Sequence, residues 1–435
     1  MRFPNWVMLE PFVFRRDDDE SFPDESKAPV RASGTTSWGA TFNIAFSLAE
    51  PPLVSRLYAQ LPVPGFPDPR RGRPLAILAT HRHLALFRLA TETSALVTVQ
   101  DFFIYSADEH PSSSLKALPP CTQPPFDYTR SDGRQRRRPP PYPPRLLSVQ
   151  SMGLLCRRKE FVVAELTLYK PSRSKVFADI CLLQSCTPAD KLGGTWKSMR
   201  VDILCSDNPD DVWQLCCWET DTVIPFDKSL CWIDYCRGIL FCDVFKAEST
   251  TPTVYFLRFP LDNFPSTNIR STTLSHFYRC VSVVNHGRTL KFVNVARHDG
   301  IAFGALKPGT GFTITCHTLK LDGSGTMTWE KDHNIDSKDL WNANLHLPHG
   351  ILMFPQVDVN RPHVVHLLYI EFGYAYNKMW VVSIDMTTMA VEPLSLYING
   401  NEGLQTDDAD LIRDKSTTPT AFLPCEFTKF HYFSR

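Results

Sequence analysis

The sequence has no long apolar run, no net charge and little glycine relative to its proline. No stretch reaches the roughly 18 apolar residues that a membrane-spanning helix needs, so a soluble protein is expected. Lys plus Arg number 46 and Asp plus Glu number 46, which excludes a whole-chain attraction to nucleic acid or an anionic membrane but not a local patch. The 35 prolines against 20 glycines disfavour long helices and favour many loops.

The common signatures of metal, nucleotide and nucleophile sites are also missing. No Cys-x-x-Cys pair, His-Glu-x-x-His motif, Gly-x-Ser-x-Gly elbow, Walker A loop or glycine-rich dinucleotide motif occurs. The opening residues lack the apolar core of a secretory leader, and there is no Asn-x-Ser/Thr sequon. The 13 cysteines, odd in number and irregularly spaced, are interpreted as reduced intracellular thiols that pack as small apolar residues. We expect no cofactor, and a cytoplasmic location with the nucleus as the alternative.

Several histidines and cysteines have the chemistry of metal ligands without the spacing. His81 and His83 in "HRH" would share one face of a strand, but zinc requires a further ligand. The remaining pairs are spaced too poorly for a site: His363 with His366, Cys216 with Cys217, and Cys181 with Cys186. A metal site is therefore not predicted.

Paired carboxylates occur in "WETD". Glu219 and Asp221 would share one face of a strand, and two such groups can perform acid–base catalysis. Acidic residues at this spacing are far more often a solvated strand face or a turn that caps backbone amides, so the structural interpretation is preferred.

The chain divides by composition. Residues 1–105 are predicted to be an amino-terminal β-rich segment that packs on the body, and residues 106–147 a linker or loop rich in proline and arginine. That segment cannot bury enough apolar area to offset its ordering entropy, so it is expected to be disordered or extended. Residues 148–400 form the predicted body, and residues 401–435 a carboxy-terminal tail.

The linker contains a basic run, Arg134 to Arg138, inside "GRQRRRPPPYPPR". This run is consistent with a nuclear localisation signal or a weak nucleic-acid arm, and the prolines also resemble a ligand for SH3 or WW domains. Short arginine runs are common in linkers, so no specific nucleic-acid partner and no membrane partner is predicted.

The body consists of short runs of Val, Ile, Phe, Tyr, Leu, Cys and Trp separated by Gly, Asp, Asn and Pro, which is typical of strands. A faint repeat places Gly238, Gly287 and Gly350 before apolar runs, with an earlier echo at Gly153. Such a pattern favours stacked four-stranded blades, which in kelch-type propellers recur at about 50 residues. The predicted fold is all-β and β-propeller-like, with five to seven blades, and a two-sheet β-sandwich is the alternative.

The stretch "LCWIDYCRGILFCDVF", Leu230 to Phe245, predicts two strands buried on both faces and joined at a tight turn around Gly238. Asp234 and Asp243 then require partners, because an unpaired buried carboxylate is costly. Arg237 is the expected partner for one of them. An Asp–Arg pair that fixes geometry is preferred over a reaction centre.

The same residues carry a family resemblance. The chain resembles a plant family, expanded in grasses, that is known as domain of unknown function 1618. Three segments carry this resemblance in order: "WETDTVIPF", "LCWIDYCRGILFCDVF" and "VYFLRFPL". The upstream "EPPLVSRLYAQLP" and "AILATHRHLALFRL" extend the similarity, which runs from about Trp38 to about Tyr397 with a core at 218–372. More distantly, the chain resembles propellers attached to plant F-box proteins, although no F-box is seen near the amino terminus.

The resemblance implies no reaction, substrate or cofactor. The sequence therefore predicts a non-enzymatic plant protein that binds another protein or a peptide through loops on a rigid scaffold. The alternatives are a substrate receptor for ubiquitin-mediated degradation, and a hydrolase or lyase that uses carboxylates in the propeller mouth. No catalytic, cofactor-binding or metal-binding residue is predicted.

Overall fold

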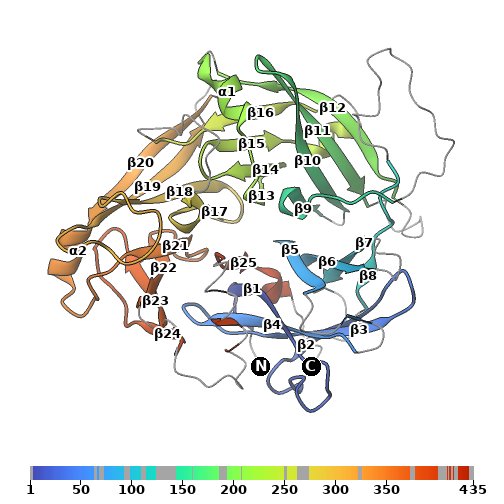
Figure 1. Ribbon diagram of the computed structural model, residues 1–435, viewed down its shortest axis with the longest axis horizontal. Helices are drawn as coiled ribbons and strands as arrows, with labels where there is room; N and C mark the ends of the chain where they lie inside the picture. Colours follow the sequence, from blue (N-terminus) through green and yellow to red (C-terminus); the bar gives the residue numbers. More distant parts are fainter. Residues whose placement is uncertain are drawn as a thin grey trace. The chain divides into compact units, whose positions relative to one another are not determined.

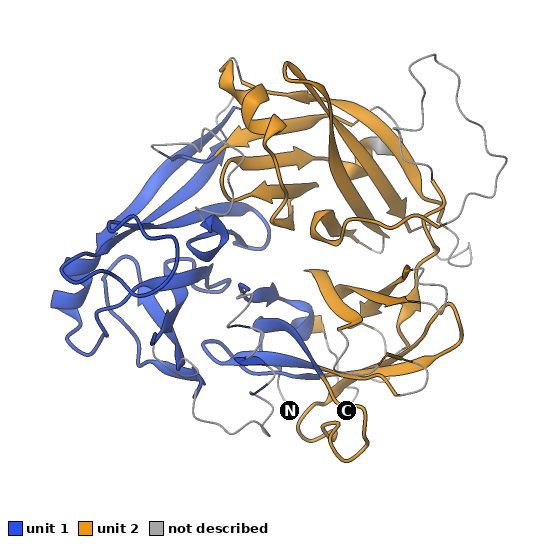
Figure 2. Ribbon diagram, viewed as in Figure 1, with its two compact units in different colours: residues 1–14, 46–57, 259–429 blue, residues 15–45, 58–258, 430–435 orange. Residues whose placement is uncertain are grey.

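The protein, in a computed structural model, is built mainly from antiparallel strands (Figure 1). The structure describes residues 3–62, 66–67, 73–92, 98–108, 114–123, 144–158, 160–185, 194–206, 208–248, 252–261, 274–321, 326–372, 378–399, 409, 411–412, 415 and 420–430. The chain forms two compact units, coloured separately in Figure 2. Unit 1 comprises Met1–Phe14, Phe46–Leu57 and Phe259–Lys429, and unit 2 comprises Arg15–Ala45, Tyr58–Arg258 and Phe430–Arg435.

Unit 1 contains two four-stranded antiparallel sheets whose strands follow one another in chain order. The first sheet consists of β17 (Arg279–Val284), β18 (Thr289–Arg297), β19 (Phe312–Leu321) and β20 (Met327–Asp336). The second consists of β21 (Leu352–Val357), β22 (Val364–Ile370), β23 (Met379–Asp385) and β24 (Ser395–Ile398). In addition, β1 (Val7–Arg15) pairs with β25 (Leu423–Cys425), so that two strands far apart in the sequence are neighbours in this unit. Among the described residues, the short helices here are α2 (Ser337–Ala343), η6 (Ser275–Phe277) and all but the last residue of η7 (Phe427–Phe430).

Unit 2 contains a four-stranded sheet of β5 (Leu75–His81), β6 (Leu84–Glu92), β7 (Thr98–Ser106) and β8 (Lys116–Ala117). It also contains two four-stranded meanders. The first consists of β9 (Met152–Arg157), β10 (Glu160–Ser172), β11 (Lys175–Gln184) and β12 (Lys197–Leu204). The second consists of β13 (Thr222–Phe226), β14 (Ser229–Asp234), β15 (Gly238–Cys242) and β16 (Val254–Arg258). Parallel pairing of β12 with β16 joins them into one eight-stranded sheet. The described helices of unit 2 are α1 (Asp210–Cys216), η3 (Val149–Ser151) and η4 (Val244–Glu248). In a further sheet, β2 (Val30–Thr35) pairs with β3 (Thr41–Ser47). Both β3 and β4 (Val54–Gln60) have residues in both units.

The eight-stranded sheet curls so that β9 contacts β13 and β14 around a shared apolar core. Trp232 of β14 is fully buried in this core, and its indole nitrogen donates to the carbonyl of Ser151 at 2.8 Å. All residues of β14 but the first, and all of β15, are buried, which explains the nearly continuous apolar run. The predicted tight hairpin between these two strands is confirmed.

The predicted all-β, propeller-like class is confirmed, because four-stranded antiparallel meanders recur in chain order, as in the blades of a propeller. The glycine repeat behind that prediction is wrong in detail. Gly153 lies within β9, Gly238 opens β15, Gly287 is in the β17–β18 turn with a φ of 85°, and Gly350 precedes β21. These glycines serve different local needs, and the meanders start at irregular intervals wider than about 50 residues.

Other local predictions have clear outcomes. The "LDGSG" hairpin is confirmed by the pairing of Leu321 with Met327, although its turn lies outside the described residues. The basic run Arg134 to Arg138 and its proline-rich flanks also lie outside them. In the described part of the chain, no helix is long and apolar enough to cross a membrane.

Gly238 tests how tightly the hairpin is packed. A Cβ atom at this position would lie 2.2 Å from the carbonyl oxygen of Leu257 and 3.0 Å from the Cα of Arg258, which are backbone atoms of β16. We expect Gly238→Ala to lower the free energy of unfolding by about 3 kcal/mol, at the upper end for overpacking. Gly39→Ala, with a φ of 91° but open space around it, should cost about 1 kcal/mol. Equal losses in urea unfolding would contradict this account.

Candidate functional site

The carboxylate of Asp234, at the end of β14, is fully buried and fully engaged. It accepts hydrogen bonds from the backbone N–H of Glu219 at 2.9 Å and of Cys236 at 2.8 Å. It also accepts from the Arg237 guanidinium at 3.0 Å, which confirms the predicted Asp–Arg pair. The remaining acid of the stretch, Asp243, is only partly buried and lies 3.7 Å from Lys246.

The "WETD" carboxylates do not form an acid–base pair. The prediction that Glu219 and Asp221 share a strand face is wrong, because both precede β13. The Glu219 side chain is exposed, whereas Asp221 accepts from the backbone N–H of Tyr235 at 2.7 Å. The carboxylates of Asp221 and Asp234 thus accept from backbone amides around the β14–β15 turn, which is the structural role that the sequence favoured for Asp221.

The "HRH" histidines do not share a strand face either. His81 is the last residue of β5, and Arg82 then takes a positive φ of 53°, so His83 belongs to the turn. The His81 Nδ1 atom accepts from the backbone N–H of Cys156 at 2.7 Å, and His83 lies 3.6 Å from Asp108. Their ring nitrogens therefore face different partners.

The cysteine pairs give no metal site in the described structure. Cys216 ends α1 and Cys217 follows it, while Cys186 lies outside the described residues. Across the residues that are described, no three His, Cys, Asp or Glu side chains come together in a way that would hold a metal ion.

A buried serine–histidine–aspartate row lies in the second sheet of unit 1. His366 of β22 sits directly opposite Ser383 of β23, and its Nδ1 atom is 2.9 Å from the Ser383 hydroxyl. Its Nε2 atom is 3.2 Å from the carboxylate of Asp358, just after β21. Because an ionised carboxylate only accepts, the ring nitrogen that faces Asp358, Nε2, carries a proton.

This row has the hydrogen-bond order of a nucleophilic triad but not its access. Ser383 and His366 are each 1% exposed and Asp358 is 3% exposed. The Trp6 ring lies 5.9 Å from that of His366. A substrate carbonyl must approach the serine oxygen closely, and this burial prevents it. The row therefore acts as a cross-strand polar connection inside the sheet.

The Asp358 carboxylate has further donors. It accepts from the backbone N–H groups of Asn360 at 2.8 Å and Arg361 at 2.9 Å, and from the Arg361 guanidinium at 3.2 Å. Burial alone raises the pKa of Asp358, but the hydrogen bonds outweigh it, so that the pKa lies below the ordinary 3.8. The anion is thus the form that this site holds.

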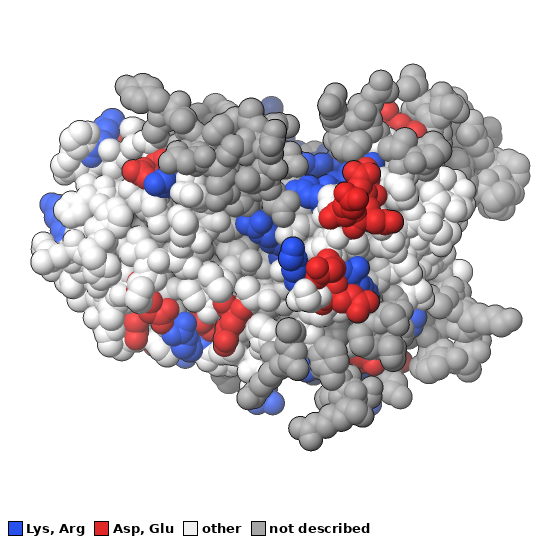
Figure 3. All heavy atoms as spheres, turned by 90° about the horizontal axis from the view of Figure 1, so that it is seen from below, with Lys and Arg blue, Asp and Glu red and all other residues white. Residues whose placement is uncertain are grey.

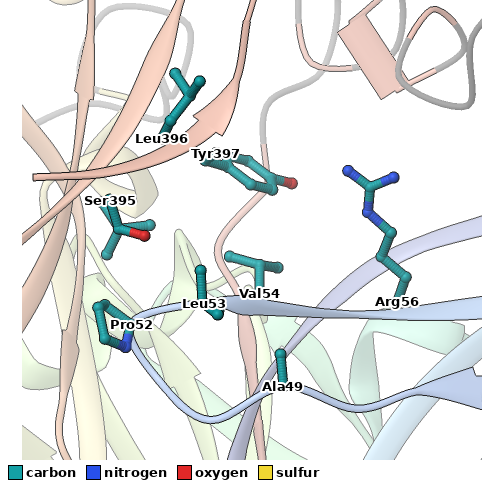
Figure 4. Close-up of a pocket in the computed structure, with 9 residues that line it drawn as sticks. Ala49, Pro52, Leu53, Val54, Arg56, Ser395, Leu396 and Tyr397 are labelled. Carbon is teal, nitrogen blue, oxygen red and sulfur yellow. The ribbon is translucent and has the colours of Figure 1, made fainter. Parts of the chain in front are cut away.

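An open pocket of unit 1 is an accessible candidate site, and we call it the β24 groove. It is lined by Ala49, Pro52, Leu53, Val54, Arg56, Val381, Ser395, Leu396 and Tyr397, with a cavity volume of about 240 Å³. Figure 4 shows Tyr397 directed toward the end where the Arg56 guanidinium stands, with Pro52 and Ser395 at the other end.

Two leucines give the groove its apolar character. Leu53 is 53% exposed and Leu396 is 52% exposed, although both are large apolar side chains. The Tyr397 hydroxyl donates to the buried carboxylate of Glu10, which fixes the ring in the wall of the groove. The groove thus combines a tyrosine ring held by a buried hydrogen bond with two exposed leucines.

Figure 3 shows one face of the molecule, on which the described basic and acidic residues lie interspersed. This mixture matches the equal numbers of basic and acidic residues in the chain.

Residues 232–366 match the model of a family described as "Protein of unknown function (DUF1618)". This segment belongs to the DUF1618 family. The match begins at Trp232, in the buried β14–β15 hairpin, and ends at His366 of the serine–histidine–aspartate row. The Asp234–Arg237 pair and the Asp358–His366 contact therefore both lie within the DUF1618 segment.

Known proteins give little beyond the family. No curated protein sequence matches the chain significantly. A thermostable family-43 glycoside hydrolase is similar in structure at 11% identity and a TM-score of 0.24, covering 58% of this chain and 72% of its own. The catalytic domain of a Coprinopsis cinerea GH62 α-L-arabinofuranosidase is similar in structure at 8% identity and a TM-score of 0.25. The match covers 76% of this chain and 90% of the arabinofuranosidase domain. At these TM-scores the likenesses carry no argument about fold or activity.

The pKa of Asp358 makes stability depend on pH. A carboxyl group whose pKa is depressed on folding stabilises the protein above its unfolded pKa, and this contribution is lost as the pH falls through the folded value. Asp358→Asn should therefore lower the free energy of unfolding by about 2 kcal/mol at pH 7. The difference from the wild type should shrink below about pH 4.

Urea unfolding at pH 7 and pH 3 measures this difference. Glu330→Gln is the control, because the Glu330 side chain is 63% exposed in its pair with Lys320, and it should change stability little at either pH. A loss in Asp358→Asn that is the same at both pH values would rule out the proposed role of the anion.

Proposed function

We propose that this DUF1618 protein is a non-enzymatic scaffold that binds another protein or a peptide, with the β24 groove as the docking site. The observation that supports this proposal is the exposure of Leu53 and Leu396 in one pocket. Apolar side chains gathered in a concave surface are a common feature of interaction sites, because a partner removes them from water.

The position of β24 favours an extended ligand. β24 is the last strand of its sheet and pairs with β23 through Trp380–Leu396 and Val381–Ser395. Strands at a sheet edge are used to bind extended peptides, with alternate side chains entering pockets beside the strand. Leu396 and its neighbours present such a surface to the groove.

The charge at one end of the groove favours an acidic ligand. Arg56 lines this end, and its guanidinium lies 5.1 Å from the centre of the buried Phe14 ring. This contact limits the directions that the cation can take, while guanidinium groups bind carboxylates well. We therefore expect an extended peptide that carries an apolar side chain for the leucines and a carboxylate for Arg56.

Burial of the polar rows argues against the enzymatic alternative. Asp234, His366 and Ser383 are inaccessible, and their polar atoms are committed to partners inside the protein. Plant origin, a cytoplasmic or nuclear location and a role as a substrate receptor in protein degradation remain predictions from the sequence.

A peptide library displayed on phage tests the groove directly. Selection on the purified full-length protein should yield peptides with an apolar residue close to an acidic one. The double variant Leu53→Asp, Leu396→Asp should bind a selected synthetic peptide at least tenfold more weakly, which corresponds to about 1.4 kcal/mol. Fluorescence anisotropy of the labelled peptide measures the dissociation constant.

Leu345→Asp is the matched control, because Leu345 is 92% exposed in the same unit and does not line the groove. It should bind the peptide like the wild type, and circular dichroism should show all variants folded. Selected peptides that bind the double variant and the wild type equally would reject the groove as the docking site.

A further inference from the structure

Two buried thiols of unit 2 lie in contact. The Sγ atoms of Cys121 and Cys181 are 3.5 Å apart, although the residues are 60 positions apart in the sequence. Cys181 lies in β11, whereas Cys121 lies in the irregular segment after β8. Both residues are more than nine-tenths buried, in a core shared with Leu183 and Trp196.

The segment that carries Cys121 is fixed on both sides. The backbone N–H of Leu118 donates to the carbonyl of Phe102 at 2.8 Å, and the Trp196 indole nitrogen donates to the carbonyl of Pro119 at 2.7 Å. The backbone N–H of Arg145 donates to the carbonyl of Cys121 itself at 2.8 Å. The approach of the two sulfur atoms is therefore built into the packing.

A buried ion pair stands beside the thiols. Glu165 of β10 is the cross-strand neighbour of Cys181, and its carboxylate accepts from the Arg145 guanidinium and from the backbone N–H of Ser148. The hydrogen bond from Cys181 lowers the pKa of Cys121 to about 7, and the positive charge of Arg145 acts in the same direction. The pKa of Cys181 is raised, because it donates that hydrogen bond and is buried. The hydrogen bond between the two sulfur atoms therefore favours the thiolate at Cys121 and the thiol at Cys181.

We propose that Cys121 and Cys181 form a redox-active pair that closes to a disulfide when a peroxide oxidises the protein. A disulfide has an S–S bond of about 2.05 Å, so the sulfur atoms must approach by about 1.5 Å. Cys121 lies outside regular secondary structure, whereas Cys181 lies in a central strand of its sheet. The other cysteines keep the role that the sequence predicts for them, as apolar packing residues.

The reaction proceeds in two balanced steps. The Cys121 thiolate attacks one peroxide oxygen, the O–O bond breaks, and Cys121 becomes a sulfenic acid while hydroxide leaves and takes up a proton to form water. The Cys181 sulfur then attacks the sulfenic sulfur, the S–O bond breaks, and a second water leaves with the thiol proton. Two thiols lose two hydrogens, and hydrogen peroxide is reduced to two waters. A dithiol reductant reverses the oxidation.

The bond has a defined structural consequence. Cys121 and Arg145 flank the stretch that includes the basic run Arg134 to Arg138. The disulfide links the start of this stretch covalently to β11, where the reduced protein has only noncovalent contacts.

Peptide mapping of the oxidised full-length protein tests the proposal. The reduced protein is treated with a small excess of hydrogen peroxide, quenched with N-ethylmaleimide and analysed by mass spectrometry without reduction. The expected result is a loss of two hydrogens and a linked peptide that joins Cys121 to Cys181. Dithiothreitol should restore the reduced mass. Links mainly between other cysteines, or oxidation of Cys121 to a sulfinic acid without a link, would overturn the proposal.

Single substitutions add a control that needs no knowledge of function. Cys121→Ser and Cys181→Ser should each abolish the loss of two hydrogens, whereas Cys205→Ser, which changes a thiol of the same unit outside the pair, should leave it intact. Persistence of the loss in either pair variant would also overturn the proposal. If a pair variant fails to fold, the map of the wild-type protein decides alone.

Discussion

A buried carboxylate requires donors on every side, and this requirement organises the interior of both units. The Asp234 carboxylate accepts hydrogen bonds from the backbone N–H groups of Glu219 and Cys236 and from the Arg237 guanidinium. In unit 1, Glu10 of β1 accepts from the backbone N–H of Phe12 and is paired with Lys415, whose ammonium also donates to the carbonyl of Thr420. Removing any of these donors leaves charge or polar atoms in a medium that solvates them poorly.

The chain path follows from these contacts. Glu10 connects the first strand to a residue near the carboxy-terminal end of the described chain, and β1 pairs with β25 in the same unit. Asp234 closes the turn between β14 and β15, so that Gly238 enters its strand against the backbone of β16. The buried contacts of Asp234 and Asp358 in the DUF1618 segment thus serve the architecture. The docking site that we propose lies instead at the exposed leucines of the β24 groove.

The sequence predicted best what depends on neighbours along the chain. The continuous apolar run around Gly238 indicated two fully buried strands, and the cost of a buried acid indicated the partner Arg237. The Ser383–His366–Asp358 row was missed, because its members come from three places whose strand register the sequence does not show. The prediction that the two histidines of "HRH" share a strand face was wrong because of a local feature. A turn at Arg82 separates two residues that a continuous strand would have aligned.

The glycine repeat shows the same limit. Glycines precede apolar runs for several reasons, such as a positive φ at Gly287 and lack of space at Gly238, and only the structure separates these reasons. The groove was equally hidden, because Leu53 and Leu396 lie far apart in the sequence and resemble any strand residues. Cys121 and Cys181 likewise become a pair only when β11 and the segment after β8 are packed together.

The central claim is that the buried charges hold the structure together, and the unfolding free energy of Asp234→Ala tests it most directly. This change leaves the Arg237 cation buried without its partner, so we expect a loss of about 3–5 kcal/mol in urea unfolding followed by circular dichroism. Glu330→Ala, which removes an exposed acid from a surface pair, should cost less than about 1 kcal/mol. An Asp234→Ala protein as stable as the wild type would contradict the account.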